Sequence, residues 1–113
     1  MHQVCKINVH KADQLVIIEV LGDLTAAAEN AMDAAYHEGC DNNARNILIK
    51  FDGKSRINSA GIAIMIDLVI KSQEKGRHIF MSGVSEHFQK IFKLVGLTKY
   101  TTIVASEEEI RSV

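Results

Sequence analysis

Hydrophobic residues along the chain gather into short runs, and stretches with helical spacing separate these runs. The first residues alternate loosely, with Val4, Ile7 and Val9 set among polar neighbours, and a polar segment follows at 11–14. The run from Leu15 to Leu21 is denser and rich in β-branched residues. We expect two strands here, joined as a hairpin by the polar segment.

The alanine-rich stretch that follows predicts the first helix, because alanine is the strongest helix former. The helix is expected to begin at Leu24 or Thr25, where the threonine hydroxyl can cap its start. Gly39 fits the left-handed position that ends many helices. A polar loop at 41–45 would lead back to the next strand.

The rest of the chain continues to alternate between strands and helices. Glycines and polar caps mark the boundaries, since the sequence contains no proline. The expected strands lie at 46–51, 78–82 and 101–105, and the expected helices run from about Ser59 to Lys75, from Ser85 to Gly96, and from Ser106 through Ile110.

The predicted order of elements is β-β-α-β-α-β-α-β-α. Strands that are separated by helices pair in parallel through right-handed crossovers, whereas the first two can form an antiparallel hairpin. The 113 residues are enough for one hydrophobic core. We therefore predict a single α/β domain over residues 1–113, with a mixed sheet of about five strands and about four helices.

Composition restricts the classes of function. Hydrophobic residues make up 47% and charged residues 24%, as in an ordinary soluble domain, and the formal net charge is -1. Such a balance gives no bulk field that attracts nucleic acid or anionic lipid. We find no signal-peptide pattern and no apolar run of the roughly 20 residues that cross a bilayer. We expect a cytoplasmic protein with no direct nucleic-acid contact and no membrane insertion.

Motifs for catalysis, metals and nucleotides are missing from the sequence. The histidines do not have the spacing of metal ligands, and His37 and Cys40 alone supply too few ligands for a metal site. Cys5 and Cys40 lie far apart and are expected to be free thiols. No glycine-rich phosphate loop occurs, and Ser59 lies outside a nucleophile elbow. We expect a binding module without enzymatic activity, metal or cofactor.

The segment from Arg56 to Ile66 is the best candidate for function, because a short polar stretch meets a long apolar helix there. A serine or asparagine at such a place can cap the helix. The hydroxyl of Ser59 could instead carry a phosphate, since free N–H groups and the positive end of the helix dipole stabilise a dianion. The residues alone leave both interpretations open.

The central helix is apolar around well over half of its circumference, and Asp67 and Lys71 form its polar stripe. Ile64 and Leu68 fall at the margin of the apolar face. They are either ordinary core residues or exposed anchors for a partner, and the same margin could serve a homodimer.

Four features in order resemble the STAS domain family, most familiarly the bacterial anti-sigma factor antagonists. They lie at 20–25, 47–51, 57–62 and 95–97, and together they span nearly the whole chain. The most specific is Asn-Ser-Ala-Gly at 58–61, which matches the family's Asp-Ser-x-Gly phosphorylation motif at three positions.

The resemblance implies a partner-switching regulator. In that family the antagonist binds an anti-sigma factor that is also a serine kinase; phosphorylation of the motif serine abolishes the complex, and a serine phosphatase restores it. Ser59 would be the phosphoacceptor, and Gly61 would keep the first helical turn bare. The implied partner-binding residues are Asp23, Leu24, Thr25, Arg56, Ile57, Asn58, Ser59, Ala60, Gly61, Ile62, Ile64 and Leu68.

Two residues depart from the family pattern. Asn58 stands where the family commonly has aspartate, and Thr25 stands where some antagonists carry another aspartate. These departures motivate an alternative function, in which the chain is a constitutive STAS subunit that docks on an ABC-type lipid-transport ATPase or another signalling complex.

Overall fold

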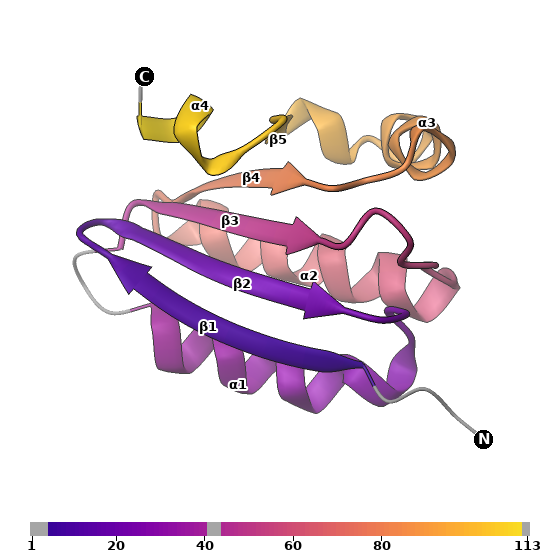
Figure 1. The fold of residues 1–113 in the computed structure, drawn as a ribbon, viewed down its shortest axis with the longest axis horizontal. Helices are drawn as coiled ribbons and strands as arrows, with labels where there is room; N and C mark the ends of the chain where they lie inside the picture. The colour runs from indigo at the N-terminus through magenta and orange to yellow at the C-terminus, as the bar shows by residue number, and fades with distance from the viewer. Residues whose placement is uncertain (1–4, 41–43, 112–113) are drawn as a thin grey trace.

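The hydrophobic runs form one mixed sheet in the computed structural model, which describes residues 5–40 and 44–111 (Figure 1). Val4 and positions 41–43 of the expected polar loop lie outside the described residues. The elements in chain order are β1 (Lys6–Ala12), β2 (Leu15–Leu21), the 3-10 helix η1 (Ala26–Ala28), α1 (Glu29–Gly39), β3 (Asn46–Phe51), α2 (Ser59–Glu74), β4 (His78–Ser82), α3 (Glu86–Leu94), the 3-10 helix η2 (Leu97–Lys99), β5 (Thr101–Ile103) and α4 (Glu107–Arg111).

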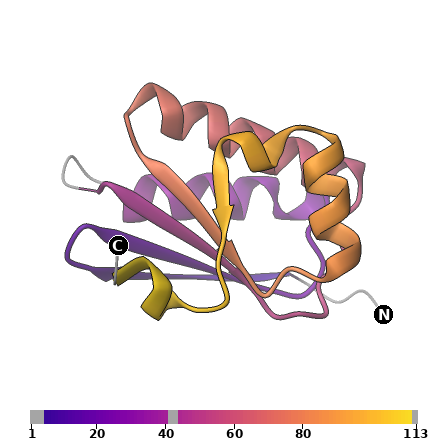
Figure 2. The same cartoon turned by 90° about the horizontal axis from the view of Figure 1, so that it is seen from above.

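The five strands lie in the sheet in the same order as in the chain, β1-β2-β3-β4-β5. β1 pairs with β2 antiparallel, and each later strand pairs with its predecessor in parallel. Right-handed crossovers between strands in this order put their helices on one face of the sheet. Figure 2 shows α1, α2 and α3 on that face and α4 on the other. The predicted α/β architecture and order of elements are confirmed.

Alternation along the strands creates two hydrophobic layers. Val16, Ile18 and Val20 of β2 point into the main core, between the sheet and α1, α2 and α3. Leu15 and Ile17, which alternate with them along β2, point to the other face. There they join Leu48, Phe80, Val104 and Ile110 in a smaller cluster under α4.

The first helix differs from its prediction at both ends. Thr25 caps the short η1 instead of a continuous helix, accepting a 3.3 Å hydrogen bond from the Ala27 N–H at its hydroxyl. Gly39 is not left-handed but is the buried last residue of α1. An added Cβ there would lie 2.6 Å from Val16 Cγ1, so glycine lets the helix approach β2 closely.

The later elements follow the expectations closely. Ser85 caps α3 by accepting a 3.4 Å hydrogen bond from the Phe88 N–H, and the left-handed Gly96 follows that helix. The last strand is shorter than predicted: β5 ends at Ile103, and the Val104 N–H donates a final 2.8 Å hydrogen bond to the Met81 carbonyl of β4.

Candidate functional site

Two loops that are distant in the sequence are joined by backbone hydrogen bonds beside the start of α2. The Leu24 N–H donates a 2.8 Å hydrogen bond to the Arg56 carbonyl, and the Asn58 N–H donates a 3.3 Å bond to the Leu24 carbonyl. Leu24 and Ile57 form a parallel bridge. The pairing of β2 with β3 thus resumes beyond the strand ends and brings the two predicted halves of the site together.

Aspartates at the strand ends fix the same loops. Asp23 accepts a 3.0 Å hydrogen bond from the Arg56 N–H. Asp52 accepts hydrogen bonds from the Lys54 N–H at 2.8 Å, the Ser55 hydroxyl at 3.0 Å and the Gly22 N–H at 3.2 Å. Desolvation opposes the charge of Asp52, but these bonds outweigh it and hold the pKa of Asp52 below its usual range. Both carboxylates therefore hold the two loops in place through hydrogen bonds.

Gly61 lets the helix start and the loops pack against each other. A Cβ at this position would overlap the Leu24 carbonyl oxygen and would lie 2.8 Å from Ile57 Cγ2. The resemblance implied that Gly61 would keep the first helical turn bare. In the structure Gly61 is buried and faces the two loops.

The cap of α2 is Asn58, not Ser59. Asn58 is extended, and its side-chain oxygen accepts a 2.9 Å hydrogen bond from the Gly61 N–H. Ser59 is the first helical residue, and its side chain is exposed. Its hydroxyl makes no hydrogen bond to any residue that the structure describes. The capping function and an accessible hydroxyl are thus divided between two neighbouring residues.

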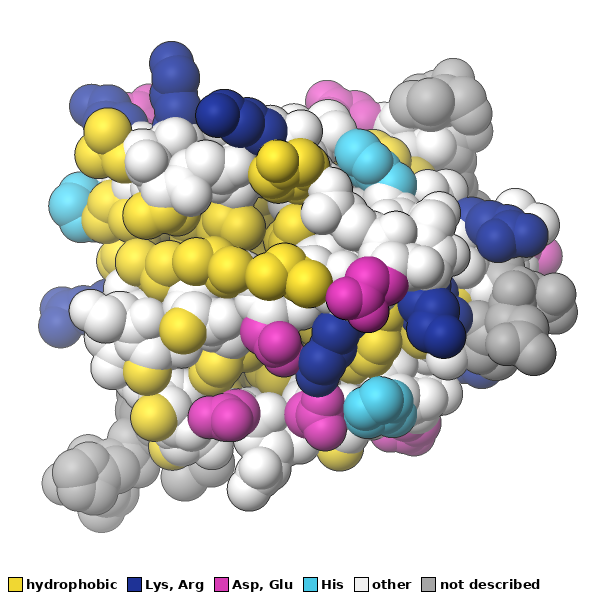
Figure 3. Space-filling view, turned by 180° about the vertical axis from the view of Figure 1, so that it is seen from behind, with side chains coloured by type: hydrophobic (Ala, Val, Ile, Leu, Met, Phe, Trp, Pro, Cys, Tyr) yellow, Lys and Arg dark blue, Asp and Glu magenta, His cyan; other side chains and the backbone are white. Residues whose placement is uncertain are grey.

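Apolar side chains lie on the solvent side of α2. Ile62 and Ile66 are partly buried and Ile70 is 50% exposed; their four-residue spacing puts them on one side of the helix. At the end of α3, Leu94 is 85% exposed and Val95 46%. Figure 3 shows hydrophobic side chains as a band over α2 that continues toward α3. These five residues are called the apolar band below.

The apolar band only partly coincides with the expected anchors. Leu68 is 4% exposed and belongs to the core, and Ile64 is partly buried. Sequence reasoning missed Ile70, although its spacing from Ile66 could have indicated it. The other partner-binding candidates divide by burial: Arg56, Asn58 and Ser59 are exposed; Asp23, Thr25, Ala60 and Ile62 are intermediate; and Leu24, Ile57 and Gly61 are buried.

Other kinds of site find no support within the described ranges 5–40 and 44–111. No group of three or more metal-binding side chains occurs among these residues. None of the helices described is both long and apolar enough to cross a membrane.

The fold and the site define a class of protein: an α/β domain with an exposed serine at the start of its central helix, beside an apolar surface. The chain belongs to the STAS domain family, whose model matches residues 6–110. The resemblance noted from the sequence is thereby confirmed. Among proteins with curated descriptions, none matches the chain in sequence.

Solved structures of similar fold include anti-sigma factor antagonists. SpoIIAA in its unphosphorylated form has 14% identity and a TM-score of 0.67, with 96% of this chain and 94% of that one covered. SpoIIAA from Bacillus in the phosphorylated form has 16% identity and a TM-score of 0.64, with 95% and 98% covered. An anti-sigma factor antagonist from Mycobacterium paratuberculosis has 16% identity and a TM-score of 0.70, with 96% and 92% covered. At 14% to 16% identity, the similarity to these structures establishes the fold alone.

Proposed function

We propose that the chain is a non-enzymatic, cytoplasmic partner-switching regulator, an anti-sigma factor antagonist that phosphorylation of Ser59 turns off. Its partners would be an anti-sigma factor with serine kinase activity and a serine phosphatase. The observation that carries the proposal is the hydroxyl of Ser59, which is exposed at the start of α2 next to the apolar band and makes no hydrogen bond to a described residue. Further support comes from the fold, which is similar to that of anti-sigma factor antagonists.

The physical effect of the phosphate is on the interface and not on the fold. Phosphorylation adds about -1.5 to -2 charges, and a partner resting on the apolar band would have to desolvate them. Within the domain the same charge is favourable, because it lies at the positive end of the α2 dipole. The modified domain should therefore stay folded and lose its partner.

The test combines phosphorylation with binding. The purified chain is incubated with ATP and each anti-sigma factor kinase encoded in the same genome, and the products are mapped by mass spectrometry. We expect one phosphate, on Ser59, and no modification of Ser59→Ala. Calorimetry should show that wild type and Ser59→Ala bind the kinase and that Ser59→Asp binds at least about tenfold more weakly, a loss of about 1.4 kcal/mol.

A matched control separates the switch from a general effect of charge. Ser106 is also exposed and immediately precedes a helix, α4, on the opposite face of the sheet. Ser106→Asp should bind like wild type. Full binding by Ser59→Asp, or a phosphate on another residue, would refute the proposal that Ser59 is the switch.

The second candidate function is constitutive docking on an ABC-type lipid-transport ATPase. The observation that favours it is the neutral Asn58 cap, which stands where the family commonly has an aspartate. Affinity purification from native lysate distinguishes the two functions. Recovery of such an ATPase with wild type and equally with Ser59→Asp would support docking without a switch.

A further inference from the structure

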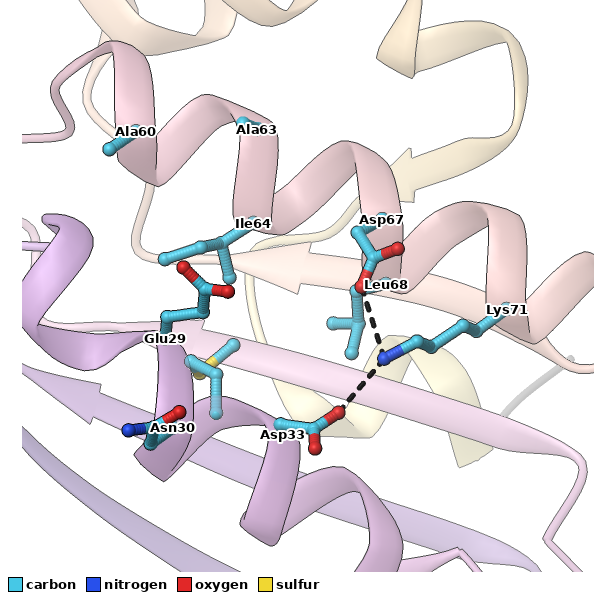
Figure 4. A pocket seen from close by; sticks show the side chains of 10 residues that line it. Glu29, Asn30, Asp33, Ala60, Ala63, Ile64, Asp67, Leu68 and Lys71 are labelled. Carbon is cyan, nitrogen blue, oxygen red and sulfur yellow. Dashed lines mark hydrogen bonds and ion pairs between the residues drawn. The ribbon is translucent and has the colours of Figure 1, made fainter.

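A groove of about 450 Å³ lies between α1 and α2 (Figure 4). Met32 from α1 and Ile64 and Leu68 from α2 give it an apolar lining. Ala60 also lines it, one residue beyond Ser59. The groove therefore extends along α2 from the immediate neighbourhood of the proposed phosphorylation site.

The groove carries an excess of negative charge. Lys71 Nζ contacts Asp33 at 2.8 Å and Asp67 at 3.0 Å. The hydrogen bonds that Lys71 donates to these two carboxylates raise the pKa of Lys71, and the bond to Asp33 lowers the pKa of Asp33. Glu29, the third carboxylate that lines the groove, has no ion-pair partner among the described residues. His37 Nε2 also lies 3.4 Å from Asp33, so Asp33 and Asp67 both have an ion-pair partner, and Glu29 is the groove carboxylate that these pairs leave without one.

An apolar lining with carboxylates beside it suits one kind of side chain. Lysine and arginine have aliphatic stems that pack on apolar surface and charged heads that pair with carboxylates. Figure 4 shows the Glu29 carboxylate directed from α1 toward Ile64 of α2, and the Lys71 ion pairs lie farther along the groove. A cationic head could reach Glu29 without displacing Lys71, whereas an acidic side chain would meet like charge.

We propose that this groove receives a lysine or arginine side chain, flanked by apolar residues, from the protein partner that docks over Ser59. The inference rests on the proposed function for the identity of the partner. Ion-pair geometry would make the groove an element of specificity, because it favours partners with a cation at this one place.

The first test uses a defined probe and does not need the partner. The full chain labelled with ¹⁵N is titrated with the peptide acetyl-Leu-Arg-Leu-amide and with the same peptide carrying citrulline, which keeps the shape and removes the charge. We expect saturable shift changes at 29–33 and 60–71, with the citrulline peptide about threefold weaker. Chemical shift changes that occur only elsewhere, or equal binding of both peptides, would refute the proposed cation site in the groove.

Two variants test whether the charge beside the groove is responsible. Glu29→Gln removes the carboxylate that has no ion-pair partner among the described residues, and Glu38→Gln makes the same change on α1 outside the groove. We expect Glu29→Gln to bind the arginine peptide about threefold more weakly and Glu38→Gln to bind it like wild type. Equal binding by the two variants would contradict the proposal.

The second test applies the same variants to the anti-sigma factor kinase. Glu29→Gln should bind about three- to fivefold more weakly than wild type, with a smaller difference at high salt. A kinase that binds wild type and Glu29→Gln equally would refute the cation site and leave the proposed partner-switching function intact. If no kinase binds wild type while the arginine peptide still fills the groove, the partner function falls and the cation site stands.

Discussion

The Leu24 N–H and the Arg56 carbonyl are joined by a 2.8 Å hydrogen bond across two loops that lie 32 positions apart in the numbering. The shape of the surface before α2 is thus determined largely by main-chain pairing. Exposed side chains such as Ser59 can change there without disturbing the pairing beneath them. Recognition and folding are therefore separable by mutation.

Gly61→Ala should destabilise the domain by about 2 kcal/mol, because the new methyl group meets the Leu24 carbonyl and Ile57. Urea unfolding measures the effect. The control is Gly53→Ala, where nothing lies within 4 Å of the added Cβ and only the φ of +84° is unfavourable, so about 1 kcal/mol is expected. Helix propensity alone predicts that Gly61→Ala gains stability, and such a gain would contradict the packing argument.

Asn58→Ala should cost about 1 kcal/mol, since the Gly61 N–H loses its acceptor. Asn58→Asp keeps the acceptor and adds a charge at the positive end of α2, so it should be about 0.5 kcal/mol more stable than wild type at neutral pH and low salt. Thermal unfolding at matched concentration compares them. Ser59→Ala, which removes no cap, should stay within about 0.5 kcal/mol of wild type. An aspartate variant as unstable as the alanine variant would refute the cap.

Ser72→Ala should raise the free energy of unfolding by about 1 kcal/mol. Ser72 is 1% exposed, and its hydroxyl has no hydrogen-bond partner among the residues described, so it bears an uncompensated desolvation cost. The comparison is Ser85→Ala, which removes the α3 cap and should lower stability. Urea unfolding should give opposite signs for the two serines; a loss in both would contradict the assignment of Ser72.

Asp52 should make the domain sensitive to acid. Its folded pKa lies below the ordinary value of 3.8, so its contribution is present above that value and is lost as the pH falls through the folded pKa. Wild type should exceed Asp52→Asn in stability at about pH 6, and the difference should shrink by about pH 3. Ser55→Ala removes one hydrogen bond and should raise the pKa of Asp52 in an NMR titration. A difference between wild type and Asp52→Asn that does not vary with pH would refute this account.

Local sequence patterns were sufficient for most of the fold. The β-branched run at β2 and the Ser85 and Gly96 boundaries of α3 were identified in advance because their causes are local. The packing of glycines was not predictable in this way. A side chain at Gly39 would clash with Val16, and one at Gly61 would clash with the Leu24 carbonyl. These neighbours are distant in the sequence, so the residues around each glycine give no indication of the contacts.

The helix face toward solvent was also hard to predict. A helix that is apolar around most of its circumference does not indicate which side its neighbours cover. Leu68 faces the core, where Met32 of α1 also lies, whereas Ile70 is half exposed. Ser59 could be singled out from the sequence, but the division of roles between it and Asn58 required the backbone conformation.

The order of the strands in the sheet has a consequence for synthesis of the chain. Each strand from β2 onward pairs with the strand that leaves the ribosome just before it. Among the described strands, β2 to β5 each meet a neighbour that has already been synthesised, and no strand must be inserted between two that have already paired. The sheet can therefore grow from one edge to the other as translation proceeds, with each crossover helix covering the newest pair.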